Sequence, residues 1–399
     1  MNLVQAGRRL TVKTPLGPDA LLVDSLVGVE ALSQPFQFDV QLLSTDEAIS
    51  FDSVVGKSIT LTFIQADGSE RYWNGVVSRF SQGPRERLAT RYYATVVPWL
   101  WLLTRTADCR IFQKKKVPDI LEQIFTDLGF KKSDDFEMRL YGSFIERDYC
   151  VQYRETDFNF VSRLMEEEGI YYFFSHEQDK HTLILTNDPA GHKPCPAQSK
   201  FRFIPNPGQN RQEDSITEWT KIQEFRPESY SVTDYNFETP SSSLAVSVPG
   251  RKKFDIYDYP GEYLKRDEGD SLARVRMQEQ TSRGVVIQGA GDCRAFTTGY
   301  SFELTDHYRQ EFNGQYILTG VRHSANQGGY GANSNGAGTD ISYSNTFECI
   351  PAAVTHRPLR TTPRPVVQGC QTAVVVGPGG EEIYTDKYGR VKVQFHWDR

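Results

Sequence analysis

The chain has 399 residues, of which 38% are hydrophobic and 24% are charged, and its formal net charge is −6. This composition excludes a disordered chain, and the acidic balance argues against a general nucleic-acid binder or a basic membrane-surface protein. The length allows about two or three domains, and 24 Phe with 20 Tyr favour β-rich cores over helical bundles.

The start of the sequence, residues 1–9, lacks an apolar segment after its charges, so we expect no secretory signal peptide. No stretch approaches the roughly 18 apolar residues of a membrane span. Six cysteines are dispersed without a C-x-x-C pair, and this spacing predicts buried free thiols at Cys109, Cys150, Cys195, Cys293, Cys349 and Cys370.

The first hundred residues predict a barrel or a sandwich. Apolar and polar residues alternate in short runs separated by turns, a pattern typical of half-buried strands. The predicted strands cover residues 10–14, 21–27, 36–42, 59–63, 73–77 and 92–97.

A helical region follows. Apolar residues spaced three and four apart predict a helix over 117–128, and a second helix is expected from Thr156 or Asp157 to Glu168, closed by Gly169. Strands over 170–174 and 182–186 come next, joined by a connection over 176–181. Five prolines between 188 and 208 predict a long loop or a domain crossing.

The later part returns to strands. They are predicted at 216–220, 229–235, 284–287, 300–304, 316–321 and 343–350, and over 254–261, which ends at a turn, with a helix over about 267–281. Residues 326–338 are rich in Gly, Asn and Ser and predict a mobile surface loop, whereas four prolines in 351–365 predict a semi-rigid linker.

The last stretch alternates most strictly. Val391, Val393, Phe395 and Trp397 should share one face of a strand, after a turn at 386–389. Few residues remain to pair with it, so we expect a domain that continues beyond Arg399. The strand should be ordered only if neighbouring chains or residues 373–376 cover its apolar face.

Candidate chemistry is sparse. His176 and His181 are spaced unlike a zinc-protease motif, so a polar hairpin tip is expected; His192 and Cys195 lack a second ligand pair. The glycines at 289–291 and 328–331 lack the strand and helix that flank nucleotide-binding loops. Glu166 to Glu168 predict a solvated helix end, and His396 is expected to be exposed. We therefore predict no enzyme activity, cofactor or metal.

Three stretches, residues 153–172, 369–378 and 386–399, together resemble the VgrG spike proteins of bacterial type VI secretion, and residues 32–36 and 257–261 also fit. The motif positions, expected to be structural and not catalytic, are Glu155, Asp157, Phe158, Arg163, Leu164, Glu168, Gly169, Asp386, Gly389, Arg390, Val391, Val393, Phe395, Trp397 and Asp398.

The resemblance implies a mainly β fold with α+β insertions. Residues 1–350 would form a phage tail-hub-like region of two barrel-like domains with a helical insert around 105–190. Residues 351–365 would be a proline-rich linker, and 366–399 the first strands of a truncated OB-fold barrel that normally precedes a β needle.

The resemblance also implies a function. The protein would be a homotrimeric hub that caps the hexameric tube, carries a tip protein and effectors, helps to puncture membranes through transient contact, and travels from the cytoplasm through the apparatus. Alternatives are a phage or tailocin baseplate hub, a carrier of an enzymatic domain beyond residue 399, and a carbohydrate- or nucleic-acid-binding module, which the charge balance disfavours.

Overall fold

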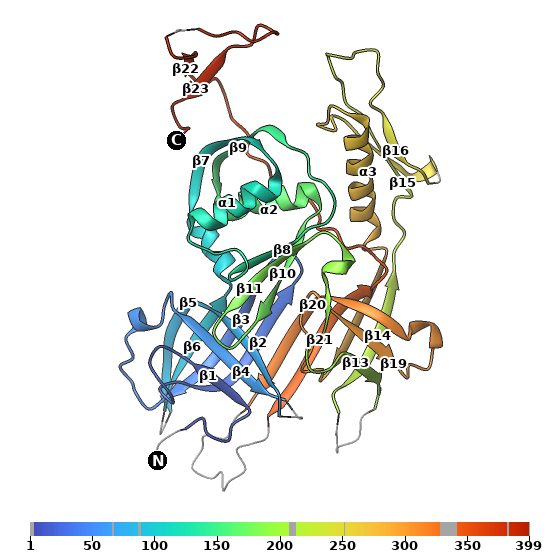
Figure 1. Cartoon of the computed structure of the whole chain (residues 1–399). Coiled ribbons are helices and arrows are strands. Elements are labelled where there is room, and N and C mark those ends of the chain that lie inside the picture. The colour runs from blue at the N-terminus through green and yellow to red at the C-terminus, as the bar shows by residue number, and fades with distance from the viewer. Residues whose placement is uncertain are drawn as a thin grey trace.

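The computed structural model describes residues 4–398 except 66–67, 87–88, 207–212, 251, 328–340 and 381–382. The predicted loop over 326–338 therefore lies almost entirely outside the described residues. The fold is mainly β with α+β insertions, as the sequence predicts. Two sheet-rich halves lie side by side, with a helical insert and a separate arm beyond them (Figure 1).

The first half contains the strands β1 (Leu10–Lys13), β2 (Leu22–Ala31), β3 (Gln34–Ser44), β4 (Ser58–Ile64), β5 (Glu70–Glu86) and β6 (Ala89–Val97). Alternation produces the predicted two faces: on β3, Phe36, Phe38 and Val40 are buried, whereas Gln37 and Asp39 are exposed. The strands neighbour one another in the order β1-β4-β5-β6-β3-β2.

The second half contains β12 (Lys193–Pro194), β13 (Lys200–Phe203), β14 (Ser215–Gln223), β18 (Val285–Gly291), β19 (Tyr300–Thr305), β20 (Gly314–Asn326) and β21 (Ser342–Pro351). Because β19 pairs with both β13 and β20, the strands β20-β21-β18-β14-β13-β19 close into a ring. The proline-rich stretch predicted as a loop thus holds two short strands, and one of them completes this ring.

One seam joins the halves. β2 pairs antiparallel with β20 from Ser25 opposite Asn326 to Ala31 opposite Gly320. At its end the side chain of Gln327 accepts a hydrogen bond from Leu10 N at 2.7 Å and donates one to Leu10 O at 2.7 Å, across 317 residues of sequence. The two halves are therefore one 13-stranded sheet.

The insert, residues 107–186, lies on the first half. It contains β7 (Ala107–Lys115), α1 (Val117–Asp127), β8 (Phe136–Arg139), β9 (Arg147–Thr156), α2 (Asp157–Glu168), β10 (Tyr171–His176) and β11 (His181–Thr186). The predicted stripe of α1 is buried from Val117 to Phe125, while Leu128 lies just past the helix end and is 38% exposed.

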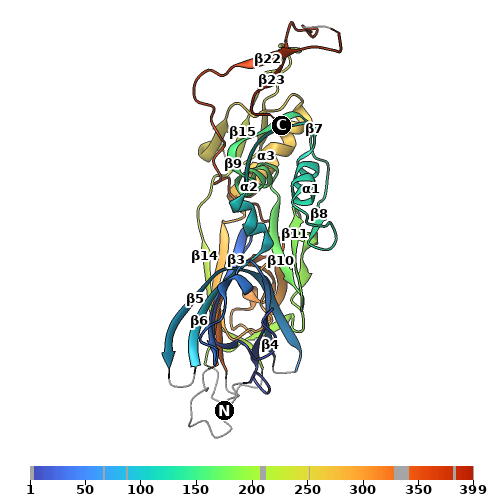
Figure 2. The same ribbon diagram turned by 90° about the vertical axis from the view of Figure 1, so that its left-hand side faces the viewer.

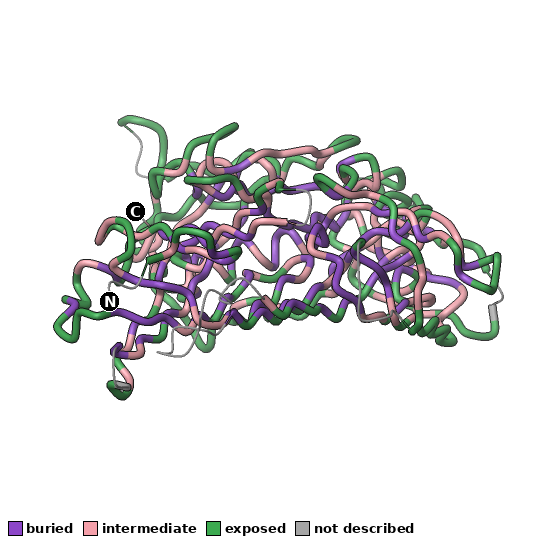
Figure 3. Tube along the Cα trace, turned by 90° about the horizontal axis from the view of Figure 1, so that it is seen from below, coloured by how far each residue is buried: buried purple, intermediate pink, exposed green. Residues whose placement is uncertain are grey.

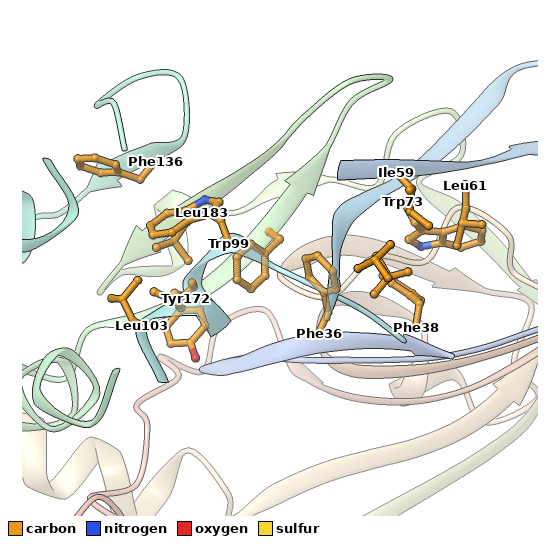
Figure 4. Packing of buried hydrophobic residues seen from close by; sticks show 14 of the residues in the cluster. Phe36, Phe38, Ile59, Leu61, Trp73, Trp99, Leu103, Phe136, Tyr172 and Leu183 are labelled. Atoms are coloured by element: carbon orange, nitrogen blue, oxygen red, sulfur yellow. The ribbon is translucent and has the colours of Figure 1, made fainter. Parts of the chain in front are cut away.

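A single buried cluster runs from the first half into the insert. It includes Phe36 and Phe38 of β3, Tyr172 of β10 and Trp99, which begins the short 3-10 helix η2 (Trp99–Arg105) (Figure 4). Seen from below, buried segments run along the middle of the molecule and exposed loops lie at its edges (Figure 3). The other 3-10 turns are η1 (Phe51–Ser53), η3 (Pro189–Gly191), η4 (Lys252–Phe254) and η5 (Gln310–Phe312).

The arm, residues 229–281, has a small core of its own. Three strands, β15 (Ser229–Val232), β16 (Val246–Val248) and β17 (Asp255–Asp258), form a sheet that packs on α3 (Arg266–Thr281). Tyr263 is buried there, and its hydroxyl lies 2.6 Å from Leu244 O, to which it donates, and 3.1 Å from Val232 O. Figure 2 shows the arm and the insert at the same end of an elongated molecule.

The C-terminal stretch forms the predicted strand, but its environment differs from the expectation. β23 (Lys392–Phe395) pairs edge to edge with β22 (Ala373–Val376), and we call this pair the ribbon. Edge pairing leaves the faces open, so Val391 is 51% and Val393 38% exposed. Residues 373–376 therefore do not cover Val391 and Val393, and cover by neighbouring chains, the other expected source, stays a prediction.

Four cysteines are buried free thiols, as predicted. Cys109 is half-buried and Cys370 is exposed, so the prediction is wrong for these two. No helix in the described ranges has the length and apolar character that a membrane crossing requires.

Candidate functional site

Helix α2 carries most of the first motif, and its ends follow from local chemistry. The hydroxyl of Thr156 accepts a hydrogen bond from Asn159 N at 3.1 Å, which caps the first turn. The helix ends at Gly169 with φ +68°, a left-handed conformation that favours glycine. Both ends lie where the sequence predicts them.

Glu155 and Arg163 form a buried ion pair. Arg163 Nε and Nη2 donate to the Glu155 carboxylate at 3.0 and 2.7 Å, and both side chains are only 7% exposed. Arg163 Nη2 also donates to Val151 O at 2.7 Å, and its guanidinium lies 4.8 Å from the ring centre of Phe160. The pair ties α2 to β9, which is a structural role.

Asp157 makes a second connection between α2 and the neighbouring strands β7 and β9. Its carboxylate accepts from Arg110 Nη2 at 3.0 Å and from Gln152 Nε2 at 2.8 Å. Leu164 is fully buried in the cluster that runs from the first half into the insert, and the half-buried Phe158 packs against that cluster. The first motif therefore connects α2 to the strands β7 and β9 and stabilises the insert.

The acidic turn, Glu166 to Gly169, is not the solvated helix end that the sequence predicts. Arg147 donates to Glu167 at 2.8 Å and to Glu168 at 2.7 Å, and the Glu167 side chain is only 10% exposed. Burial opposes ionisation of Glu167, but its interactions with Arg147 and other arginines outweigh burial and lower its pKa.

Carboxylates at a helix C-terminus are disfavoured by the helix dipole, so the acidic turn needs positive partners. Arg276 of α3 supplies some of the compensation, donating to the carbonyl oxygens of Glu166 at 3.3 Å and Glu167 at 2.7 Å. Arginines from the insert and from α3 thus converge on one helix end, which connects the insert to the arm.

A second polar group, the junction cluster, lies between the halves and the insert. We define it as Glu30 of β2, Arg71 of β5, His176 of β10 and His323 of β20. Glu30 lies 3.6 Å from His176 Nε2, 3.3 Å from His323 Nε2 and 3.9 Å from Arg71 Nη2. Burial opposes ionisation of Glu30, but the two nearby histidines, of which His323 is within hydrogen-bond distance, and the charge of Arg71 hold its pKa far below the ordinary value.

The histidine prediction needs correction. The hairpin tip is residues 177–180, whereas His176 and His181 pair across the two strands and are largely buried. His181 Nε2 accepts from Trp99 N at 2.9 Å and its Nδ1 lies 2.8 Å from Asn74 Oδ1, so the ring is held neutral. Burial lowers the pKa of His181 to about 3.

Sequence reasoning missed Glu30 and His323 altogether. The signal for Glu30 was present, because it has the same strand parity as the buried Leu26 and Gly28 of β2. A charge on the inward face of a strand indicates a buried partner, although the sequence does not say which one.

The arrangement favours structure over catalysis. Glu30 borders a cavity of about 10 Å³, enough for about one water molecule and not for a substrate. Among the described residues, no group of three His, Cys, Asp or Glu side chains is arranged to hold a metal. Both nitrogens of His192 are engaged, with Gly299 O at 2.6 Å and the Tyr171 hydroxyl at 2.8 Å.

The terminal motif forms a turn that is closed by Asp386. Asp386 closes the predicted turn by accepting from Tyr388 N and Arg390 N, each at 2.9 Å, and Gly389 has φ +75°. Arg390 Nε donates a hydrogen bond to the Asp386 carboxylate at 2.6 Å. His396, beyond the turn, is exposed as predicted.

The ribbon is held at both ends. At one end the ring of Trp397 packs against Tyr153, and Asp398 accepts from Ile111 N at 3.1 Å. At the other end the ring of Tyr388 packs against Phe237 in the arm. The ribbon therefore spans the insert and the arm while its face stays open.

Comparison with known proteins gives a consistent answer. The family model described as phage tail baseplate hub (GPD) matches residues 29–329. The type VI secretion system spike proteins VgrG1b and VgrG1c of Pseudomonas aeruginosa are each 42% identical over all of this chain. The chain spans about half the length of these relatives, 54% and 55%.

A solved structure shows the same fold. The Escherichia coli c3393 protein, described as a component of the type VI secretion system with structural similarity to the T4 bacteriophage tail proteins gp27 and gp5, superposes with a TM-score of 0.73. The match covers 97% of this chain and 88% of that one at 23% identity.

Proposed function

Since the chain belongs to the phage tail baseplate hub family and is a VgrG-type spike protein, we propose that three copies assemble into the hub of a type VI secretion apparatus. The trimer would cap the hexameric tube, carry a tip protein and effectors, and contact the target membrane only transiently while helping to puncture it. It would wait in the cytoplasm and leave through the apparatus. The family is structural, and the chain is not an enzyme.

The observation that carries this proposal is the pairing of two six-stranded arrangements in one chain. The first runs from β1 to β2 and the second closes between β19 and β20. Three chains with two such units each offer six similar units, which matches the symmetry of a hexameric tube. The junction cluster and the seam support this idea, because they hold the two units in one fixed orientation.

We also propose the division into domains that the resemblance implies. Residues 1–350 would be the hub region with its insert around 105–190, 351–365 the linker, and 366–399 the first strands of an OB-fold barrel. The exposed valines of the ribbon are consistent with a surface that further strands would cover. An enzymatic effector domain beyond residue 399 would be cargo of this hub and would not change its function.

Native mass spectrometry tests the assembly. We expect a species at three times the 45.4 kDa of one chain, and cosedimentation of that species with the hexameric tube protein. The measurement should be made on the 399-residue chain and on any longer product of the same gene. A strict monomer in both, at tens of micromolar protein, would refute the trimeric hub.

A phage or tailocin baseplate hub is the second candidate, because the matching family model describes that protein and phage tail proteins share the fold. Cosedimentation separates the two candidates. Binding to a phage or tailocin tube and not to a secretion tube would favour the second.

A further inference from the structure

Residues 356–364, which the sequence predicts as part of a semi-rigid linker, pack against α2 and α3, and we call them the strap. Arg357 and Pro358 are buried. We propose that the strap locks the C-terminal end of α2 to α3 and thereby fixes the direction in which the chain leaves the hub. Only the second part, the direction of the spike, rests on the proposed function.

Arg357 is the first anchor of the strap. Its Nη1 donates to Gly169 O, just after α2, at 2.9 Å, and also to Asn187 O, just after β11. Its Nε donates to Gln278 Oε1 of α3 at 2.9 Å. A guanidinium that is 8% exposed must keep its hydrogen bonds, so this residue joins three elements that are far apart in sequence.

Glu166 is the second anchor. Its Oε2 accepts from the backbone N–H groups of Thr361 at 3.0 Å and Thr362 at 2.9 Å, and its Oε1 accepts from the Thr362 hydroxyl at 2.8 Å. Hydrogen bonds to an ionised carboxylate are about twice as strong as neutral ones. One side chain of the acidic turn thus fixes the backbone of the strap.

Two flanking arginines extend the contact. Arg360 lies 3.3 Å from Glu279 of α3, and Arg364 lies 2.9 Å from Glu167 and 2.6 Å from Glu262. Both arginine side chains are roughly half exposed, so solvent screens these ion pairs and weakens them. They therefore add orientation more than stability.

The prolines of the segment have a role in this arrangement. Pro358 and Pro363 restrict φ before the strap binds, which lowers the conformational entropy lost on ordering it. The same composition that predicts a semi-rigid spacer therefore also makes a segment that binds a surface at low entropic cost. Where it lies depends on Glu166 and Arg357, which composition does not reveal.

Hydrogen exchange with residue-level mass spectrometry tests the strap, because two of its amides donate to one carboxylate. In the parent protein we expect the Thr361 and Thr362 amides to exchange at least about tenfold slower than unprotected amides. Glu166→Ala should remove that protection. Glu122→Ala, a matched change on α1 whose carboxylate pairs with the exposed Lys132, should leave it unchanged.

A second variant, on the strap itself, distinguishes release of the strap from a general folding defect. Arg357→Met should speed exchange across residues 356–362 while peptides of β3 and β6 keep their slow exchange. The proposal is overturned if the Thr361 and Thr362 amides of the parent are unprotected, or if Glu166→Ala speeds exchange in α2 alone. A trimer with an unprotected strap refutes the strap only, and a monomer with a protected strap refutes the assembly only.

Discussion

Removing Arg163 is the sharpest test of the α2 motif. Arg163→Met removes the side chain that donates to the buried Glu155 carboxylate in the ion pair described above. It also removes the donor to Val151 O. Breaking a buried ion pair from one side costs about 3–5 kcal/mol, because a charge stays in the interior without compensation. We therefore expect the free energy of unfolding to fall by about 3–5 kcal/mol.

The double variant Glu155→Leu/Arg163→Met should recover most of that loss, since an apolar pair of similar volume often replaces a buried ion pair without a net cost. Recovery should fall short by about 1 kcal/mol, because Val151 O still lacks its donor. Urea unfolding followed by circular dichroism and Trp fluorescence measures both variants.

Arg202→Met is the matched control for this experiment. Arg202 pairs with Glu213 and Asp306 at 2.9 and 2.6 Å, but its side chain is 55% exposed. Losing these exposed pairs should cost only about 0–1 kcal/mol. If Arg163→Met costs no more than Arg202→Met, the buried pair does not stabilise the fold and the structural reading of the motif is wrong.

Two further predictions concern pH and backbone conformation. Because the pKa of His181 is depressed to about 3, its contribution to stability is complete above about pH 6.5 and is lost towards pH 3, at up to about 1.4 kcal/mol per pH unit. The urea midpoint of the parent should therefore fall as the pH is lowered from 8 to 5, and the midpoint of His181→Gln should fall less. Parallel curves for the two proteins would contradict this prediction. Gly169→Ala should lower the melting temperature more than Gly129→Ala does. Both glycines have positive φ, but an added Cβ at Gly169 would lie 2.7 Å from a side chain of α3, whereas nothing lies within 4 Å of one at Gly129. Equal losses of melting temperature would contradict the close approach at Gly169.

Local patterns in the sequence predict local structure well here. The stripe of α1, the caps of α2 at Thr156 and Gly169, and the alternation of Phe36 and Phe38 all appear as expected, because each depends on residues a few positions apart. The caps follow from one hydroxyl and one left-handed residue, so a few positions of sequence contain the whole cause.

Features that depend on distant partners could not be predicted this way. In the sequence Glu30 is an isolated charge, because Arg71 and the two histidines that lie near it belong to the distant strands β5, β10 and β20. The acidic turn looks like an exposed helix end, because its arginines come from other parts of the chain. The two short strands at 193–194 and 200–203 lie in a proline-rich stretch, and they form because β19 pairs with both of them and β14 pairs with the second.

The seam between β2 and β20 has a consequence for how the chain becomes folded during synthesis. Strand β2 leaves the ribosome early, but its partner β20 and the side chain of Gln327 follow only after most of the chain has been made. Until then β2 presents an unpaired edge, and closing such a distant pair is slow. Nascent chains shorter than about 330 residues should therefore depend on chaperones, whereas chains that include β20 should become resistant to protease in one step.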